Sequence, residues 1–176
     1  MPQQQKQPKP LLSRLLKHRW TDQADLARAL PAMAIAGLEA AVRASEARHS
    51  GEICICVEAG LPLSYLSKRL SARQRAVTLF GKLRVWDTEA NNGVLIYLLL
   101  ADQAIEIVAD RGLNARVGEA QWAAIVESLR GHLRLGQFEQ GLRAAVDAVD
   151  ALLQAEFSLA PGQSNPNELA DAVVIL

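Results

Sequence analysis

Three short polar segments, each beside an apolar run, hold the residue types best suited to chemistry. Residues 49–52 read "HSGE", residues 87–92 read "DTEANN" and residues 110–112 read "DRG". Carboxylate and amide oxygens are the ligands that calcium and magnesium prefer, and the guanidinium of Arg111 matches a phosphate or a carboxylate through its fork of donors. The segments therefore predict a site for a divalent cation or an anionic group, if the fold brings them together.

The same segments also have the composition of ordinary turns. Asn tolerates left-handed backbone conformations, Gly adopts them without a steric penalty, and Asp side chains often bond to their own backbone. Asn92-Gly93 and Asp110–Gly112 both satisfy this description. A site and a pair of turns are both open interpretations of these residues.

The apolar runs beside the polar segments predict the strands that would position them. Residues 52–58 carry apolar side chains on both faces, which is typical of a strand covered on two sides and assigns Cys54 and Cys56 to the core. Residues 93–109 are two β-rich runs separated by the polar pair "DQ", which indicates an antiparallel hairpin. More than thirty residues separate the first run from the second, so a parallel, right-handed crossover is predicted. All three polar segments would then meet at one edge of the sheet.

Helical patterns account for most of the remaining chain. Pro31 suits the first turn of a helix that should end near Gly51, where we expect a left-handed glycine cap. Ser71 and Gln74 have the spacing of a capping box at the start of the helix between the strands. Two more amphipathic helices are expected on either side of Gly136. The order α, β, α, β, β, α, α predicts an α/β protein, a three-layer α/β/α sandwich with a small central mixed sheet.

Composition excludes several classes of protein. The chain has 176 residues, 50% of them hydrophobic, which is enough for one core. Lysine plus arginine equals aspartate plus glutamate at 19 each, so no global basic field favours nucleic acid as a partner. The longest apolar run, residues 94–101, is too short to span a membrane. With two cysteines and no export signal, a cytoplasmic location is expected.

We divide the chain into three parts. Residues 1–20 form a basic N-terminal tail and a short amphipathic helix, with five basic residues and no acidic ones. Residues 1–10 are expected to be a mobile tail, and the helix at 11–20 either docks on the domain or associates weakly with a membrane surface. Residues 21–157 form the α/β domain. Residues 158–176 form a linker and a short apolar tail that would add an edge strand.

Three stretches resemble the TPM domain family, which includes a photosystem II repair protein of the thylakoid lumen and many bacterial proteins. They are "SEARHSGEICICVE", "LRVWDTEANNGVLIYLLLADQAIEIVADRGL" and "GQFEQGLRAAVDAV", and the resemblance covers about residues 20–157. It implies an α/β/α sandwich with a divalent-cation site, usually for calcium. The implied ligands are Asp87, Glu89, Asn92 and Asp110. Better-known members are exported and often carry a membrane anchor, and the chain resembles a shorter cytoplasmic branch.

Two functions follow from these expectations. The first is a noncatalytic module that binds an unknown protein partner through loops held by calcium or magnesium. The second is a metal-dependent phosphomonoesterase, an activity that the resemblance implies for some members of the family. In that enzyme Asp87 or Asp110 would act as nucleophile or orient a water, and Arg111 would neutralise charge on the phosphoryl group.

Overall fold

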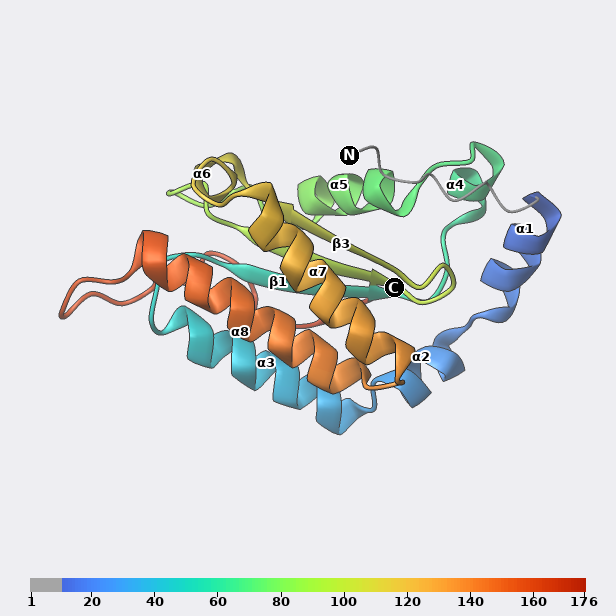
Figure 1. Ribbon diagram of the computed structural model, residues 1–176, viewed down its shortest axis with the longest axis horizontal. Helices are drawn as coiled ribbons and strands as arrows, with labels where there is room; N and C mark the ends of the chain where they lie inside the picture. Colours follow the sequence, from blue (N-terminus) through green and yellow to red (C-terminus); the bar gives the residue numbers. More distant parts are fainter. Residues whose placement is uncertain (1–10) are drawn as a thin grey trace.

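The computed structural model describes residues 11–176, so the mobile tail expected at residues 1–10 lies outside the described residues. Figure 1 shows helices above and below a central sheet. The elements in chain order are α1 (Leu11–Trp20), α2 (Gln23–Ala29), α3 (Ala32–Glu46), β1 (Ile53–Glu58), α4 (Leu63–Ser67), α5 (Ala72–Lys82), β2 (Val94–Leu99), β3 (Ala104–Ala109), α6 (Arg111–Asn114), α7 (Glu119–Arg134), α8 (Phe138–Phe157) and β4 (Val174–Ile175).

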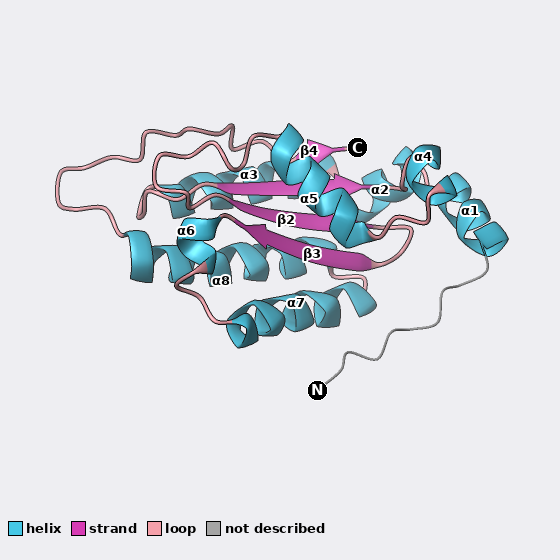
Figure 2. Cartoon of the chain, turned by 90° about the horizontal axis from the view of Figure 1, so that it is seen from above, coloured by secondary structure: helices cyan, strands magenta, loops and turns pink. Residues whose placement is uncertain are grey.

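The sheet is mixed, with the strand order β3-β2-β1-β4 (Figure 2). β1 and β2 are parallel, with Ile53 opposite Val94, and β2 and β3 form an antiparallel hairpin in which Val94 lies opposite Ala109. The crossover and the hairpin predicted from the sequence are both confirmed. The two parallel strands therefore begin at the edge where β3 ends.

Alternate side chains of each strand face two different layers of helices. Ile53, Ile55 and Val57 pack in one core with residues of α3, α7 and α8. Cys54 and Cys56 pack in a second core with residues of α4 and α5. All six residues of β1 are buried, and so are all six of β2, which gives these strands the continuous apolar pattern of a sheet covered on both faces. The α/β/α sandwich is confirmed.

Local capping signals explain two helix boundaries. At the start of α5, the Ser71 amide donates to Gln74 Oε1 at 2.8 Å and the Gln74 amide donates to Ser71 Oγ at 3.2 Å, which confirms the predicted capping box. The left-handed cap expected at Gly51 is wrong: α3 ends at Glu46, its C-cap Ala47 lies in the right-handed region, and Gly51 has no positive φ. Glycine is needed there for space, because a Cβ would lie 2.5 Å from Leu153 Cδ2.

The basic helix α1 docks on the domain through one face. Arg14 Nη2 lies 2.9 Å from Asp102 Oδ2, and His18 Nε2 lies 3.1 Å from Asp102 Oδ1. On the opposite face, Leu16 is 45% exposed and Trp20 is 75% exposed. Nowhere within residues 11–176 is a helix both long and apolar enough to cross a bilayer, as expected from the short apolar runs.

The C-terminal residues return to the sheet after α8. Figure 1 shows this segment leaving α8 at one end of the molecule and running back to the C-terminus near the sheet. β4 pairs in parallel with β1, so that Cys56 lies opposite Val174 and Val57 lies opposite Ile175. The predicted edge strand is confirmed. The segment also contacts the loops that lead into β1 and β2, which the sequence did not indicate.

Candidate functional site

The three polar segments meet where β1 and β2 begin and β3 ends. Asn92 Nδ2 donates to Ser50 Oγ at 3.2 Å, which joins the loop before β2 to the loop before β1. The Asp110 amide donates to the Gly93 carbonyl at 2.9 Å, which joins the end of β3 to the start of β2. The predicted meeting of the segments at one sheet edge is therefore confirmed.

Turn chemistry accounts for part of this edge. Asp110 is the N-cap of α6, and its Oδ1 accepts from the Arg111 amide at 2.7 Å. Arg111 Nε donates to Asn91 Oδ1 at 3.1 Å, and Asn91 has a φ of 53°. Gly112 allows the two loops to touch, because a Cβ there would lie 2.5 Å from the Asn91 carbonyl oxygen and 2.6 Å from that of Ala90. The backbones of the two loops are thus packed directly against each other.

Two side-chain oxygens at this edge are not explained by turn chemistry. Asn92 is fully buried. Its backbone amide donates to Thr88 Oγ1 at 3.0 Å and its side-chain Nδ2 donates to Ser50 Oγ. Its side-chain oxygen Oδ1 has no hydrogen-bond partner. Asp110 Oδ2 is also buried without a partner. A buried acceptor left unpaired costs about 1–3 kcal/mol. Among the described residues, no other buried side-chain oxygen lacks a hydrogen-bond partner.

The other two candidate ligands lie on the exposed part of the same loop. Asp87 is 41% exposed and forms an ion pair with Arg84. Glu89 is exposed, and its amide donates to the Glu168 carboxylate at 3.0 Å. The structure therefore separates the four residues into a buried pair, Asn92 and Asp110, and an exposed pair, Asp87 and Glu89.

The unpaired oxygens at this edge are one carboxylate oxygen, of Asp110, and one amide oxygen, of Asn92, and not a cage of carboxylates. Within residues 11–176, no three His, Cys, Asp or Glu side chains are grouped in a way that could hold a metal ion. A cation bound here would draw on the Asp110 carboxylate, the Asn92 amide oxygen and neighbouring oxygens such as Ser50 Oγ. Calcium accepts amide and carbonyl oxygens of this kind, whereas magnesium retains more of its water.

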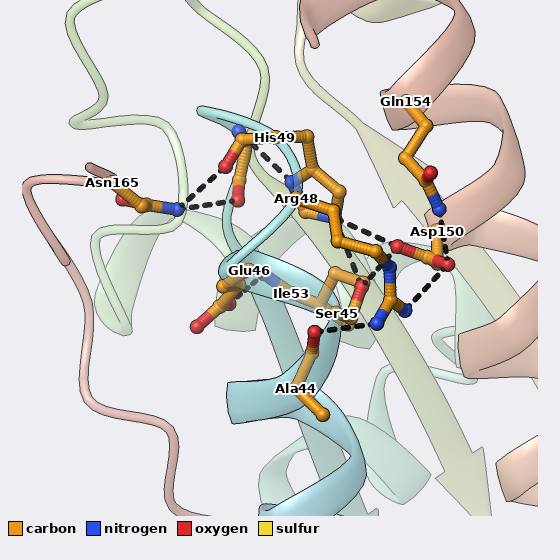
Figure 3. A network of polar contacts seen from close by, with 10 residues as sticks. Ala44, Ser45, Glu46, Arg48, His49, Ile53, Asp150, Gln154 and Asn165 are labelled. Atoms are coloured by element: carbon orange, nitrogen blue, oxygen red, sulfur yellow. Dashed lines mark hydrogen bonds and ion pairs between the residues drawn. The ribbon is translucent and has the colours of Figure 1, made fainter. Parts of the chain in front are cut away.

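A buried Ser-His-Asp group lies next to the edge, between α3 and α8 (Figure 3). Ser45 Oγ donates to Asp150 Oδ1 at 2.9 Å and lies 2.9 Å from His49 Nε2. His49 Nδ1 accepts from the Gly51 amide at 3.2 Å, so the ring proton is on Nε2 and points toward Ser45. The serine therefore donates to the aspartate and accepts from the histidine.

This arrangement is the reverse of a hydrolase triad, in which the histidine takes the serine proton. Arg48 Nη2 completes the group at 2.7 Å from Asp150 Oδ2. Burial lowers the pKa of His49, which keeps the imidazole neutral. The group ties α3 to α8 and fixes the loop that carries Ser50. No local pattern in the sequence indicates this group, because Asp150 is 105 residues from Ser45.

Two buried carboxyl groups at the start of β1 face the C-terminal segment. Glu46 Oε1 accepts from the Ile53 amide at 2.8 Å. Burial raises the pKa of Glu46 to about 9, and the neighbouring carboxylates of Glu52 and Asp171 add to this rise. Glu52 is fully buried, and burial raises its pKa as well. Its Oε1 accepts from the Glu168 amide at 3.1 Å.

A cavity of about 390 Å³ lies between the end of α3 and the C-terminal segment. Seven of the eight residues around it are polar or charged. The lining residues are Arg43, Glu46, Ala47, Gln163, Ser164, Asn165, Asn167 and Asp171. The segment therefore bridges this part of the domain without filling the space beneath it.

Comparisons with known proteins agree with this fold. The family model for the TPM domain matches residues 23–152. The NMR structure of the BA42 protein from the psychrophilic bacterium Bizionia argentinensis has a TM-score of 0.73 and 25% identity, covering 84% of this chain and 95% of that chain. The NMR structure of the N-terminal domain of a P. gingivalis protein has a TM-score of 0.58 and 22% identity, with 84% and 90% coverage, and shows the fold alone. No curated protein matches the sequence.

Proposed function

Because the chain belongs to the TPM domain family, we propose that it is a partner-binding module with a site for calcium or magnesium at the edge where β1 and β2 begin. The observation that carries the cation site is the pair of buried oxygens, Asn92 Oδ1 and Asp110 Oδ2, that lack hydrogen-bond partners. A cation between the two loops would satisfy oxygens that the protein leaves unpaired. Asp87 and Glu89 add negative charge on the exposed part of the same loop.

The cation would act by holding two loops in one conformation. One loop carries Asn92 and the other carries Asp110, and their backbones are already in contact through Gly112. A ligand that binds only the folded arrangement stabilises it by about 2.7 kcal/mol at a concentration one hundred times its Kd. Loops fixed in this way form a surface for an unidentified protein partner.

We also propose a reducing, cytoplasmic compartment and a weak contact between residues 11–20 and a membrane surface. The compartment is supported by the free thiols of Cys54 and Cys56, whose pKa values burial raises to about 12. The membrane contact is supported by the exposed Leu16 and Trp20, which are four residues apart on the outer face of α1. A single short helix gives only weak attachment.

A metal-dependent phosphomonoesterase is the second candidate, favoured by the word phosphatase in the name of the matching family model. In this alternative the unpaired Asp110 oxygen would serve as nucleophile or would orient a water. Asp87 is the other acid available at the edge. Arg111 lies beside Asp110, where it would neutralise charge on a phosphoryl group.

Isothermal titration with calcium and with magnesium tests the site, followed by p-nitrophenyl phosphate turnover in the same samples. The informative variant is Asp110→Asn, which keeps the oxygen that caps α6 but removes the carboxylate charge. Asp147→Asn, an exposed aspartate on α8, is the matched control. Binding lost in Asp110→Asn and kept in Asp147→Asn, without turnover, supports the module. Turnover that depends on Asp110 favours the phosphatase, and an absence of binding in the native chain contradicts both.

A further inference from the structure

The C-terminal segment is held on the domain largely through its own backbone. The Glu168 and Leu169 amides face the Glu52 carboxylate at 3.1 Å and 3.4 Å. Further along, the Val173 amide donates to Glu39 Oε1 at 3.1 Å. These contacts recognise peptide N–H groups, which every residue except proline provides. The acceptors on the domain therefore suit many extended sequences.

The outer edge of β1 continues this pattern of backbone recognition. At its start, the outward-facing Ile53 amide is satisfied by the Glu46 carboxyl group. At its end, the Leu176 amide donates to the Val57 carbonyl and the Ala59 amide donates to the Leu176 carbonyl, both at 3.0 Å. Between the two, β4 supplies only two strand residues, at the sheet edge (Figure 2). The outer edge of β1 is therefore an edge that pairs with an added strand, and the chain's own β4 fills it.

Apolar positions on both sides of the edge add a side-chain preference. Val173 is 9% exposed and packs in the core beneath α3 and α8, whereas Val174 packs against the core beneath α5. Leu169 also packs against the α5 side. An occupant of this edge therefore needs an extended backbone with apolar side chains that alternate between the two faces.

Few side chains of the segment are buried before it reaches β4. Residues 159–172 contain no helix or strand, and most of their side chains are exposed. They bridge the 390 Å³ cavity instead of filling it, and they follow the residues matched by the family model, 23–152. Segments with few buried contacts are the ones that open locally at low free-energy cost.

We propose that the outer edge of β1, with the acceptors Glu39 and Glu52, is a strand-binding groove for an extended apolar segment of a partner protein, and that residues 165–176 occupy it within the same chain. The inference rests on the proposed function for the existence of a protein partner, but it does not depend on the cation. The partner segment pairs in parallel with β1 and presents free peptide N–H groups to the two carboxylates. Strand addition of this type takes its affinity from the main chain and its specificity from alternate side chains.

Fluorescence anisotropy with a labelled peptide of residues 165–176 tests the groove on the full-length chain. The intramolecular segment competes at an effective concentration of the order of mM, so the native chain should bind the peptide weakly. Val173→Asp places a charge in the core beneath α3 and should release the segment without altering the groove. We expect this variant to bind the peptide at least ~10-fold more tightly than the native chain does. If Val173→Asp does not fold, Ile175→Asp, at a less buried position, is used in its place to release the segment.

Further variants separate groove binding from nonspecific binding. Adding Glu39→Ala to the released chain removes one acceptor and should weaken binding several-fold, whereas Glu127→Ala on α7 should not. The inference would be overturned if Glu39→Ala and Glu127→Ala had equal effects, or if a scrambled peptide bound equally well. It would also be overturned if both released variants were folded by circular dichroism but neither bound the peptide. Concentration-dependent dimers of the native chain that Val173→Asp abolishes would assign the groove to a second copy and would also overturn it. Calcium titration of the same variants reports separately on the proposed cation site.

Discussion

The two ends of the sheet differ in whether their buried carboxylate and amide oxygens have hydrogen-bond partners. Where the parallel strands end, Arg75 donates to both oxygens of Glu58 at 2.9 Å and 2.6 Å, and Tyr97 Oη donates to Glu58 Oε2 at 2.6 Å. All three residues are buried, and Arg75 also lies over the Tyr65 ring at 5.0 Å. The charges of Glu58 and Arg75 are therefore paired with each other, as a structural network requires.

Where the strands begin, the pairing is incomplete. Asn92 Oδ1 and Asp110 Oδ2 are buried without partners, although both residues use their other polar atoms. Buried unpaired oxygens are uncommon in native proteins and call for an explanation such as an ion or a water. Burial alone therefore does not identify a site, because the buried ion pair of Glu58 and Arg75 lies at the end where the hydrogen bonds are already made.

The largest effect is expected from breaking the paired end. Arg75→Met leaves the Glu58 carboxylate buried without its cation and should lower the free energy of unfolding by about 3–5 kcal/mol. Urea denaturation followed by circular dichroism measures the change. Arg73→Met, an exposed neighbour on α5, is the control and should change stability by less than about 1 kcal/mol. Equal effects of the two substitutions would contradict the structural role of the paired end.

The next effect concerns the unpaired end. Saturating calcium should raise the free energy of unfolding of the native chain by about 2.7 kcal/mol at one hundred times Kd, and Asp110→Asn should abolish that increase. Without calcium the same variant should differ little from native, because the oxygen that caps α6 is retained. Thermal denaturation with and without calcium measures both quantities. A calcium effect that survives the substitution would place the cation elsewhere.

A third prediction concerns the buried acid beside this end. Burial raises the folded-state pKa of Glu46 from 4.5 to about 9, so the folded chain holds a proton that the unfolded chain releases. This contribution to stability is complete below pH 4.5 and is lost as the pH rises toward about 9. The slope should reach up to ~1.4 kcal/mol per pH unit.

Glu46→Gln tests this slope because glutamine keeps an oxygen for the Ile53 amide but does not titrate. Denaturation series from pH 5 to 9 should show a flatter profile for the variant, with greater stability than native above neutral pH. Glu52 contributes in the same direction, so some slope should remain. Parallel profiles for the two proteins would show that Glu46 does not titrate in this range.

The sequence predicted the parts of the molecule that local patterns determine. The apolar runs identified β1, β2 and β3, and the Ser71 and Gln74 spacing identified the start of α5. Gly51 was predicted to be a left-handed helix cap, but it lies at a crowded position instead. A sequence does not distinguish a glycine needed for its backbone conformation from one needed because a side chain would not fit. The apolar C-terminal run predicted the edge strand β4, but the contact between Glu168 and Glu52 had no local signal, since the two residues are 116 positions apart.

At the candidate edge, the sequence identified the loops but did not show which of their side chains are exposed and paired and which are buried without a partner. Asp87 and Asp110 are the same residue type in similar polar segments. In the fold, Asp87 pairs with Arg84 at the surface, whereas Asp110 has one buried oxygen without a partner. This difference depends on how β3 ends against the loop before β2, and no spacing within either segment records it.

The smallest expected effect concerns α1, which packs at the end of the molecule where the polar groups are paired. Its inner face is held by Arg14 and His18, so Leu16 and Trp20 are presented to solvent in a fixed orientation. Residues 1–20 carry five basic and no acidic residues, which favours an anionic membrane surface. Full-length protein should therefore bind phosphatidylglycerol vesicles weakly, and less at high salt.

Trp20→Ala should reduce this vesicle binding several-fold, because Trp20 is the largest exposed apolar group on the helix. Trp86→Ala is the matched control, since Trp86 is 50% exposed and follows α5. Co-sedimentation with anionic and with neutral vesicles measures the difference. If the two variants bind equally, the outer face of α1 does not contact lipid. If Trp20→Ala alone loses binding, the paired end of the sheet has a second role as the support that orients a membrane-binding helix.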